Sequence, residues 1–136
     1  CAAVADFTPC HTADKKIKKQ PGQTEMTIEL TTTTDIAATL GKVKGENGKV
    51  KGENGKVKGE KIVVGFALET HDEQANALRK LQSKNLDMIV LNSLQDQGAG
   101  FGVDTNKVTL LYANGTKKDL PLLLKQEVAD VIIDSI

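Results

Sequence analysis

Long apolar runs in the second half of the chain predict two buried strands with a helix between them. KIVVGFA (61–67) and LDMIVLN (86–92) are continuous apolar runs, which are typical of strands covered on both faces. The segment 70–85 between them carries apolar residues at helical spacing, namely Ala75, Leu78 and Leu81. Strand, helix and strand in this order form a right-handed crossover, so this stretch predicts parallel neighbours in a sheet.

Polar residues that can cap free backbone N–H groups predict two helix starts. Thr70 stands three residues before Glu73, which is the spacing of a capping box, and this pair is expected to open the helix between the two strands. Earlier in the chain, Thr34 or Asp35 is suited to cap a short helix with the sequence IAATL. Gly41 follows directly and is expected to end that helix.

Further strands and a last helix are predicted on both sides of this unit. AAVADF (2–7) is expected to be a buried strand, and TEMTIELTTTT (24–34) alternates as a half-exposed strand does. KVTLLYA (107–113) and DLPLLLK (119–125) predict a hairpin around an Asn-Gly turn, and a closing helix is expected over 126–136. Its apolar face comprises Val128, Val131, Ile132 and Ile136. The predicted fold class is α/β: a Rossmann-like, mostly parallel sheet with a C-terminal β-hairpin and helix, whose N-terminal strands we expect to precede the first residue.

Residues 41–60 repeat one heptapeptide, GKVKGEN, almost three times. Each copy holds two glycines and one apolar residue, so a helix would lose about 1 kcal/mol per glycine and would have no apolar stripe to bury. A solenoid is excluded, because stacked repeats are usually about 20 residues or longer. Lengthening a surface loop costs only about 0.6 kcal/mol per doubling. The repeats are therefore interpreted as a loop insertion in one domain, 1–136.

Composition and charge narrow the class of protein. The 136 residues are 39% hydrophobic and 26% charged, which is ordinary for a globular domain. Eighteen basic and eighteen acidic residues cancel, so no overall field attracts nucleic acid or a membrane, and neither is expected as a partner. Residues 1–61 nevertheless hold eleven lysines against eight acids, which favours an anionic ligand. Cys1 and Cys10 cannot staple a framework, and no apolar run approaches the ~20 residues that span a bilayer, so a reduced, cytoplasmic protein is expected.

Three stretches are candidates for chemistry, and no Walker loop or dinucleotide fingerprint accompanies them. KKIKK (15–19) is either a solvated face or a mobile flap that lays a lysine on a polyphosphate. Lys80 and Lys84 share one helix face and are candidates to bind an anion, unless Lys80 pairs only with Asn76 or solvent. Phe66, in GFALET, either reaches the crevice beyond the carboxyl edge of the sheet, where α/β folds bind ligands, or belongs to the core.

Together these motifs resemble one enzyme family. AAVADFTP, KIKK, TIEL with a TDIA helix start, VVGFALET, RKLQSKNLD, GAGFGVDTN and a closing EVADVI helix are similar, in order and spacing, to phosphopantothenoylcysteine synthetase. This is the ligase half of the bacterial bifunctional flavoprotein of coenzyme A synthesis. The resemblance covers nearly the whole chain apart from the heptads. It implies a ligase that joins 4′-phosphopantothenate to L-cysteine with CTP and Mg²⁺ through an acyl-cytidylate, while FMN belongs to the decarboxylase half, which is absent from this chain.

The resemblance also implies roles for individual residues. Lys16, the first lysine of KIKK, would clamp the triphosphate and is the catalytic candidate, and no metal-ligating residue is assigned. The nucleotide-binding positions that match the family's motifs are Asp6, Lys16, Thr34, Asp35, Ile36, Ala37, Phe66, Lys80 and Lys84. Thr34 replaces the family's usual proline. A homodimer is implied, paired through the strand that TEMTIEL resembles.

Other functions stay open beside the ligase. The family's glycine-rich nucleotide loop and the Asn that holds the acyl-cytidylate are expected upstream of Cys1, so this chain is interpreted as a fragment that is inactive by itself. The alternative from another class is a non-catalytic module whose lysine loop binds a nucleotide or another polyanion. A third is a scaffold built around the heptads.

Overall fold

The structure is a computed structural model that describes residues 5–44, 49–51, 57–93, 98–99 and 102–136. It divides the chain into two units, Cys1–Asp35 (unit 1) and Ile36–Ile136 (unit 2). Unit 1 holds β1 (Phe7–Pro9) and β2 (Leu30–Thr32). Unit 2 holds α1 (Ile36–Lys44), β3 (Lys49–Lys51), β4 (Val57–Glu60), β5 (Val64–Glu69), α2 (Glu73–Ser83), β6 (Met88–Ser93), β7 (Thr105–Asn106), β8 (Val108–Tyr112), β9 (Lys117–Asp119), β10 (Leu123–Leu124) and α3 (Lys125–Ile133).

Unit 1 is a short antiparallel ribbon that closes a long loop. β1 pairs with β2, and the Cys10 N–H donates a hydrogen bond of 2.9 Å to the Glu29 carbonyl at the base of the loop. Of the strand expected over 2–7, residues 2–4 lie outside the described residues, and of residues 5–7 only Phe7 belongs to a strand. The strand expected over 24–34 is limited to β2. Both strands are exposed within unit 1, because two strands alone have no layer to pack against.

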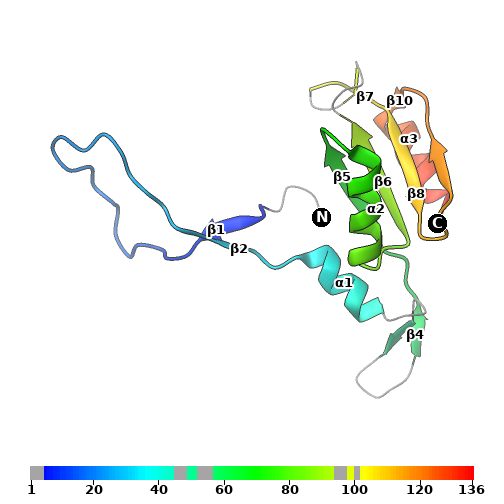
Figure 1. The fold of residues 1–136 in the computed structure, drawn as a ribbon, viewed down its shortest axis with the longest axis horizontal. Helices are drawn as coiled ribbons and strands as arrows, with labels where there is room; N and C mark the ends of the chain where they lie inside the picture. Colours follow the sequence, from blue (N-terminus) through cyan, green and yellow to red (C-terminus); the bar gives the residue numbers. More distant parts are fainter. Residues whose placement is uncertain (1–4, 45–48, 52–56, 94–97, 100–101) are drawn as a thin grey trace. The chain divides into compact units, whose positions relative to one another are not determined.

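The main sheet of unit 2 has four strands in the order β5-β6-β8-β9 (Figure 1). β5 and β6 pair in parallel along their whole length, whereas β6–β8 and β8–β9 are antiparallel. The predicted α/β class, with its strand-helix-strand unit, hairpin and C-terminal helix, is confirmed. The expected mostly parallel order holds only for β5–β6 among the described strands, because β8 and β9, which form the predicted hairpin, continue the sheet in antiparallel pairing.

α2 and α3 cover opposite faces of this sheet (Figure 1). The cluster under α2 comprises Ala67, Ala77, Leu81, Leu86, Ile89, Leu91 and Leu111. The cluster under α3 comprises Met88, Val90, Val108, Leu110, Leu120 and Val128. Neighbouring residues of β6 alternate between the two clusters, as the pleat requires. Full burial of one such side chain contributes about 1.5–3 kcal/mol, so the continuous apolar runs are what fix this layer.

The start of α2 differs from the prediction. Its N-cap residue is Asp72, with φ 47° and no side-chain cap hydrogen bond, whereas Thr70 was expected to cap it. The Asn76 N–H donates to the Asp72 carbonyl as the first backbone hydrogen bond of the helix, and Asn76 Nδ2 donates to the His71 carbonyl just before it. α2 ends at Ser83, and its buried residues are Ala77 and Leu81, while Ala75 and Leu78 are exposed.

Gly41 does not end α1, which continues to Lys44. A Cβ atom on Gly41 would lie 1.8 Å from the carbonyl oxygen of Lys84, and Asn85 Nδ2 donates a hydrogen bond of 2.9 Å to the Gly41 carbonyl. The glycine is therefore needed for the close approach of α1 to the end of α2, since any side chain would separate the two helices.

Both ends of the repeat-containing segment meet at Asp87. Lys44, in the first heptad, donates from Nζ to Asp87 Oδ1 at 2.8 Å, and the Val63 N–H, which follows the last heptad, donates to Oδ2 at 2.7 Å. Between these ends, β3 and β4 pair as an antiparallel ribbon. Residues 45–48 and 52–56 lie outside the described residues. The described parts of the repeat-containing segment are thus the end of α1 and the β3–β4 ribbon, and Asp87 contacts the residues on either side of that ribbon.

The C-terminal region keeps the predicted Asn114-Gly115 turn, with Gly115 at φ 85°. The second strand of this hairpin is β9, at Lys117–Asp119, which pairs with β8. Leu123–Leu124, which was expected in the same strand, pairs with β7 in a separate two-stranded sheet. In α3, Val128 is buried and Val131 and Ile132 are half-buried, as expected. Ile136 lies beyond the end of α3 and is exposed, so it does not belong to the predicted apolar face.

Candidate functional site

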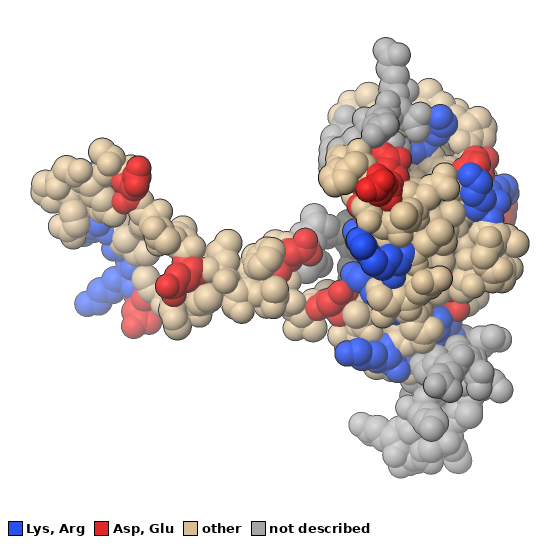
Figure 2. Space-filling view, in the orientation of Figure 1, with Lys and Arg blue, Asp and Glu red and all other residues tan. Residues whose placement is uncertain are grey.

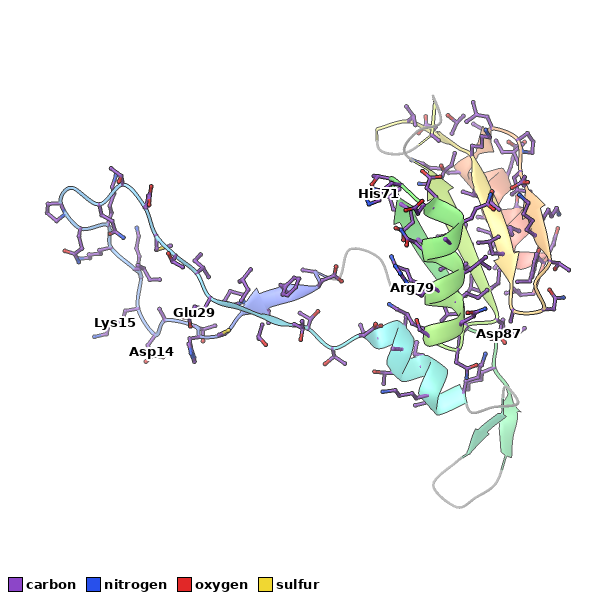
Figure 3. The ribbon with its side chains drawn as sticks, viewed as in Figure 1. Asp14, Lys15, Glu29, His71, Arg79 and Asp87 are labelled. Carbon is purple, nitrogen blue, oxygen red and sulfur yellow. The ribbon has the colours of Figure 1, made fainter. Side chains whose placement is uncertain are left out.

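The predicted site residues of unit 1 lie on and beside the β1–β2 ribbon. The Thr33 N–H donates to the Asp6 carbonyl at 2.9 Å, so strand pairing places Asp6 next to the segment that contains Thr34 and Asp35. Lys16 lies in the long loop, next to Lys15, which Figure 3 labels together with Asp14 and Glu29. Asp6, Lys16, Thr34 and Asp35 are all exposed within unit 1. Their roles as nucleotide contacts stay predictions.

In unit 2, the start of α1 and the C-terminal part of α2 lie side by side. Ala37 packs against the cluster under α2, and one turn later Gly41 approaches the Lys84 backbone. Ile36 opens the helix and is exposed. The first turn of α1 and the C-terminal end of α2 are therefore neighbouring parts of unit 2.

Lys80 is held by an acid rather than by Asn76 or by solvent alone. Its Nζ lies 2.6 Å from Glu69 Oε1 at the end of β5. Figure 2 shows basic side chains over α2 and acidic side chains where this helix begins. Figure 3 shows Arg79 on α2, and it shows His71 and Asp87 at opposite ends of the sheet. Arg79 itself donates to Asn76 Oδ1 at 2.8 Å. The surface of α2 thus combines cations with an ion pair at the carboxyl end of β5.

Phe66 does not lie on the same side of the sheet as Lys80. Ala67 belongs to the cluster under α2, whereas Val64 packs against the cluster under α3, and alternation along β5 places Phe66 on the same face as Val64. Phe66 as a whole residue is 73% exposed, so the interpretation as a core residue is wrong. The expected convergence of Phe66 with Lys80 and Lys84 is not seen within unit 2, because the strand's pleat separates them.

Sequence reasoning missed Asn92, in β6. Its Oδ1 is buried and accepts no hydrogen bond from any residue that the structure describes. Met88 and Val90 face α3, so Asn92 lies on that face too, in register with Leu68 on β5. An unsatisfied buried acceptor costs about 1–3 kcal/mol, and a ligand N–H is one group that relieves this cost. A polar residue that ends a buried apolar strand was the signal available in the sequence.

The described residues contain neither a metal centre nor a membrane-spanning helix. These residues contain no group of three or more His, Cys, Asp or Glu side chains placed to hold a metal ion. None of the helices in this part of the chain is long and apolar enough to cross a membrane. Away from the site, the pKa of Asp119 on β9 is lowered, first by the hydrogen bond from Thr109 and then by Lys117.

The fold and these residues define an α/β domain whose parallel strand pair carries a basic helix on one face and an exposed aromatic residue on the other. Comparison with known proteins gives the family. The chain belongs to the family described as the DNA/pantothenate metabolism flavoprotein C-terminal domain, which matches residues 1–136. The resemblance found from the motifs is thereby confirmed.

Individual relatives agree with this membership. The coenzyme A biosynthesis bifunctional protein CoaBC of Bacillus subtilis (strain 168) is 45% identical over 135 residues, which are 99% of this chain and 29% of that protein. A protein of an unknown prokaryotic organism, named cysteine/cysteine sulfinic acid decarboxylase, is 52% identical over 99% of this chain and 33% of its own length. The chain therefore spans about a third or less of these curated relatives.

Solved structures support the fold. The crystal structure of the C-terminal domain of a CoaBC protein is 34% identical, with a TM-score of 0.65, over 98% of this chain and 49% of that one. The DNA/pantothenate metabolism flavoprotein from Streptococcus pneumoniae shares the fold at 17% identity, with a TM-score of 0.64, over 98% of this chain and 58% of that one.

Proposed function

We propose that this chain is part of a ligase of coenzyme A biosynthesis that joins 4′-phosphopantothenate to L-cysteine at the expense of CTP. In the first step the pantothenate carboxylate attacks the α-phosphate, which gives an acyl-cytidylate and pyrophosphate. In the second step the cysteine amine displaces CMP. The observation that carries the proposal is the family membership over residues 1–136, supported by the packing of α1 against the cluster under α2 and against the Lys84 backbone.

The lysines have a physical task in the first step. A carboxylate and a triphosphate are both anions, so cations must offset the charge that accumulates as they meet. In this proposal Lys16 clamps the triphosphate from the loop of unit 1, and Lys80 and Lys84 contact the nucleotide from α2. Asp6 and the segment 34–37 complete the nucleotide contacts. Mg²⁺ arrives with the triphosphate, because Mg²⁺ is usually held by substrate phosphates with few protein ligands. The proposal assigns FMN to the decarboxylase half of the family's bifunctional proteins.

The face that carries Phe66 and Asn92 is assigned a separate role. Phe66 offers an exposed apolar surface, and Asn92 offers a buried acceptor on the same face of the parallel strands. 4′-Phosphopantothenate contains both methyl groups and an amide N–H, which match these two features. We therefore place the acyl substrate, rather than the cytosine, next to Phe66.

A homodimer paired through unit 1 is part of the proposal. Three apolar side chains alternate along the second half of the loop and β2, and each is more than half exposed: Met26, Ile28 and Leu30. Such a row is suited to pair with its own copy. Light scattering should give a dimer for the unaltered chain and a monomer for Ile28→Lys. A monomer in both cases would remove dimerisation from the proposal.

Nucleotide binding separates the ligase from a polyanion-binding module. Calorimetry is done on a chimera in which this chain replaces the matching residues of the Bacillus subtilis CoaBC protein. With Mg²⁺ and CTP, ATP or pyrophosphate, it should give the tightest binding for CTP. Equal affinity for all three would favour the polyanion module, since a site that reads only phosphate charge has no base preference.

Catalysis is tested in the same chimera. Formation of the acyl-cytidylate should fall by about 100-fold or more in Lys16→Ala, the range for removal of one group that stabilises developing charge. Lys15→Ala is the matched control, because it removes the same charge from the same loop. Equal rates for both variants would exclude a specific role for Lys16.

A further inference from the structure

The Glu69 carboxylate is largely shielded from water and contacts two side chains of the protein. It is the last residue of β5, on the face that α2 covers, and its side chain is 13% exposed. A carboxylate that has lost most of its hydration needs compensating donors. Lys80 supplies one at 2.6 Å to Oε1, and Asn76 Nδ2 lies 3.5 Å from Oε2. Asn76 is in turn fixed by its hydrogen bond to the His71 carbonyl.

The same contact leaves Lys80 partly available. Its side chain is 43% exposed, and an ammonium group has three N–H donors, of which Glu69 takes one. A free lysine stem explores many rotamers, and ordering it costs binding energy when a ligand arrives. Here the ammonium is already fixed at the carboxyl end of β5 before any ligand binds.

We propose that Glu69 is a positioning residue that holds the Lys80 ammonium group in place for the phosphates of a nucleotide. This inference rests on the proposed function and adds a residue that the motifs did not assign. A simpler role for Glu69 is that of a countercharge, whose negative charge weakens the binding of an anion. The two roles predict opposite effects of substitution.

The test measures Mg²⁺–CTP affinity by calorimetry, in the chimera with the Bacillus subtilis CoaBC protein, for Glu69→Gln, which removes the charge, and Glu69→Asp, which keeps it but shortens the reach. Positioning predicts that both variants bind CTP about three- to tenfold more weakly, the range for re-ordering one long side chain. A countercharge predicts tighter binding for Glu69→Gln and no change for Glu69→Asp. Asp72→Asn is the matched control, because it removes a charge at the same end of α2 and should leave CTP affinity unchanged or improved.

Two further measurements show whether Glu69 acts through Lys80. In a Lys80→Ala background, Glu69→Gln should no longer weaken binding. Independently of any ligand, the NMR signal of the Lys80 ammonium should be observable in the unaltered chain and lost through faster exchange in Glu69→Gln, with an unchanged circular dichroism spectrum. An unchanged Lys80 signal, or CTP binding that neither Glu69 variant weakens, would overturn this inference alone. Failure of the unaltered chimera to bind CTP would overturn the proposed function and this inference with it.

Discussion

The ion pair between Lys44 and Asp87 joins a buried side chain to a partly exposed one, so we predict that replacing either residue changes stability by a different amount. The Lys44 side chain is 6% exposed, whereas that of Asp87 is 36% exposed and also accepts from the Val63 N–H. Removing one partner of a buried pair costs about 3–5 kcal/mol, because the other charge remains buried without compensation. Replacing a buried charge by an apolar group of similar volume is often nearly neutral.

Asp87→Ala should therefore be the damaging change. It leaves Lys44 buried and removes the acceptor of Val63, and since water already reaches Asp87 we take the low end of the range, about 3 kcal/mol. Lys44→Met should cost about 1 kcal/mol or less, because its stem keeps the packing and Asp87 keeps water and Val63. The double variant should be about 1–2 kcal/mol more stable than Asp87→Ala alone, because the uncompensated charge is gone.

Urea unfolding followed by far-ultraviolet circular dichroism measures these differences. The helices that the structure describes all belong to unit 2, so the helical signal reports the unit that contains the contact. With a slope of about 1.5 kcal/mol per molar, Asp87→Ala should lower the midpoint by about 2 M. The reasoning would be refuted if Lys44→Met lowered the midpoint as much as Asp87→Ala, or if the double variant were less stable than either single one.

Three other outcomes are expected. Gly41→Ala should destabilise unit 2 by about 1–3 kcal/mol in urea unfolding although alanine favours helices, because its Cβ would overlap the Lys84 carbonyl; a gain in stability would disprove the close packing. Asp119 has a pKa below its ordinary 3.8, so its contribution to stability is present above that pH and is lost as the pH falls through the folded-state value. NMR titration of its carboxyl carbon should show a higher pKa in Thr109→Val, and an unchanged pKa would exclude that hydrogen bond as the main cause. Deleting residues 48–54 should leave the urea midpoint of unit 2 nearly unchanged, because loop length costs little; a large loss would support the scaffold interpretation.

The β5–α2–β6 layer was predictable because its signal is local. Continuous apolar runs and helical spacing identify buried elements without knowledge of their partners. Alternation along β5 also contained information that the motif interpretation did not use. Val64, Phe66 and Leu68 necessarily share a face that Ala67 and Glu69 do not, so the separation of Phe66 from Lys80 follows from the pleat alone.

Other features depend on residues that are distant in sequence. Gly41 had the sequence context of a helix end, but its role is decided by the backbone of Lys84, which follows many residues later. The partner of Lys80 is likewise decided by where β5 ends, which places Glu69 within reach. Asn92 was visible as a polar residue in an apolar strand. That its oxygen has no hydrogen-bond donor among the described residues is a property of packing that no spacing rule gives.

Lys44 and Val63 both donate to the Asp87 carboxylate, and the heptad repeats lie between them in the sequence. This arrangement affects which changes in repeat number the fold can accept. Two copies of the heptad are identical and the third differs only at its last residue, so loss or gain of a whole copy by replication slippage preserves the reading frame. Each such event rebuilds a glycine at position 41 and a lysine at position 44, because every copy begins GKVK. Copy number can therefore drift between strains while the residues that join α1 to the sheet are renewed each time.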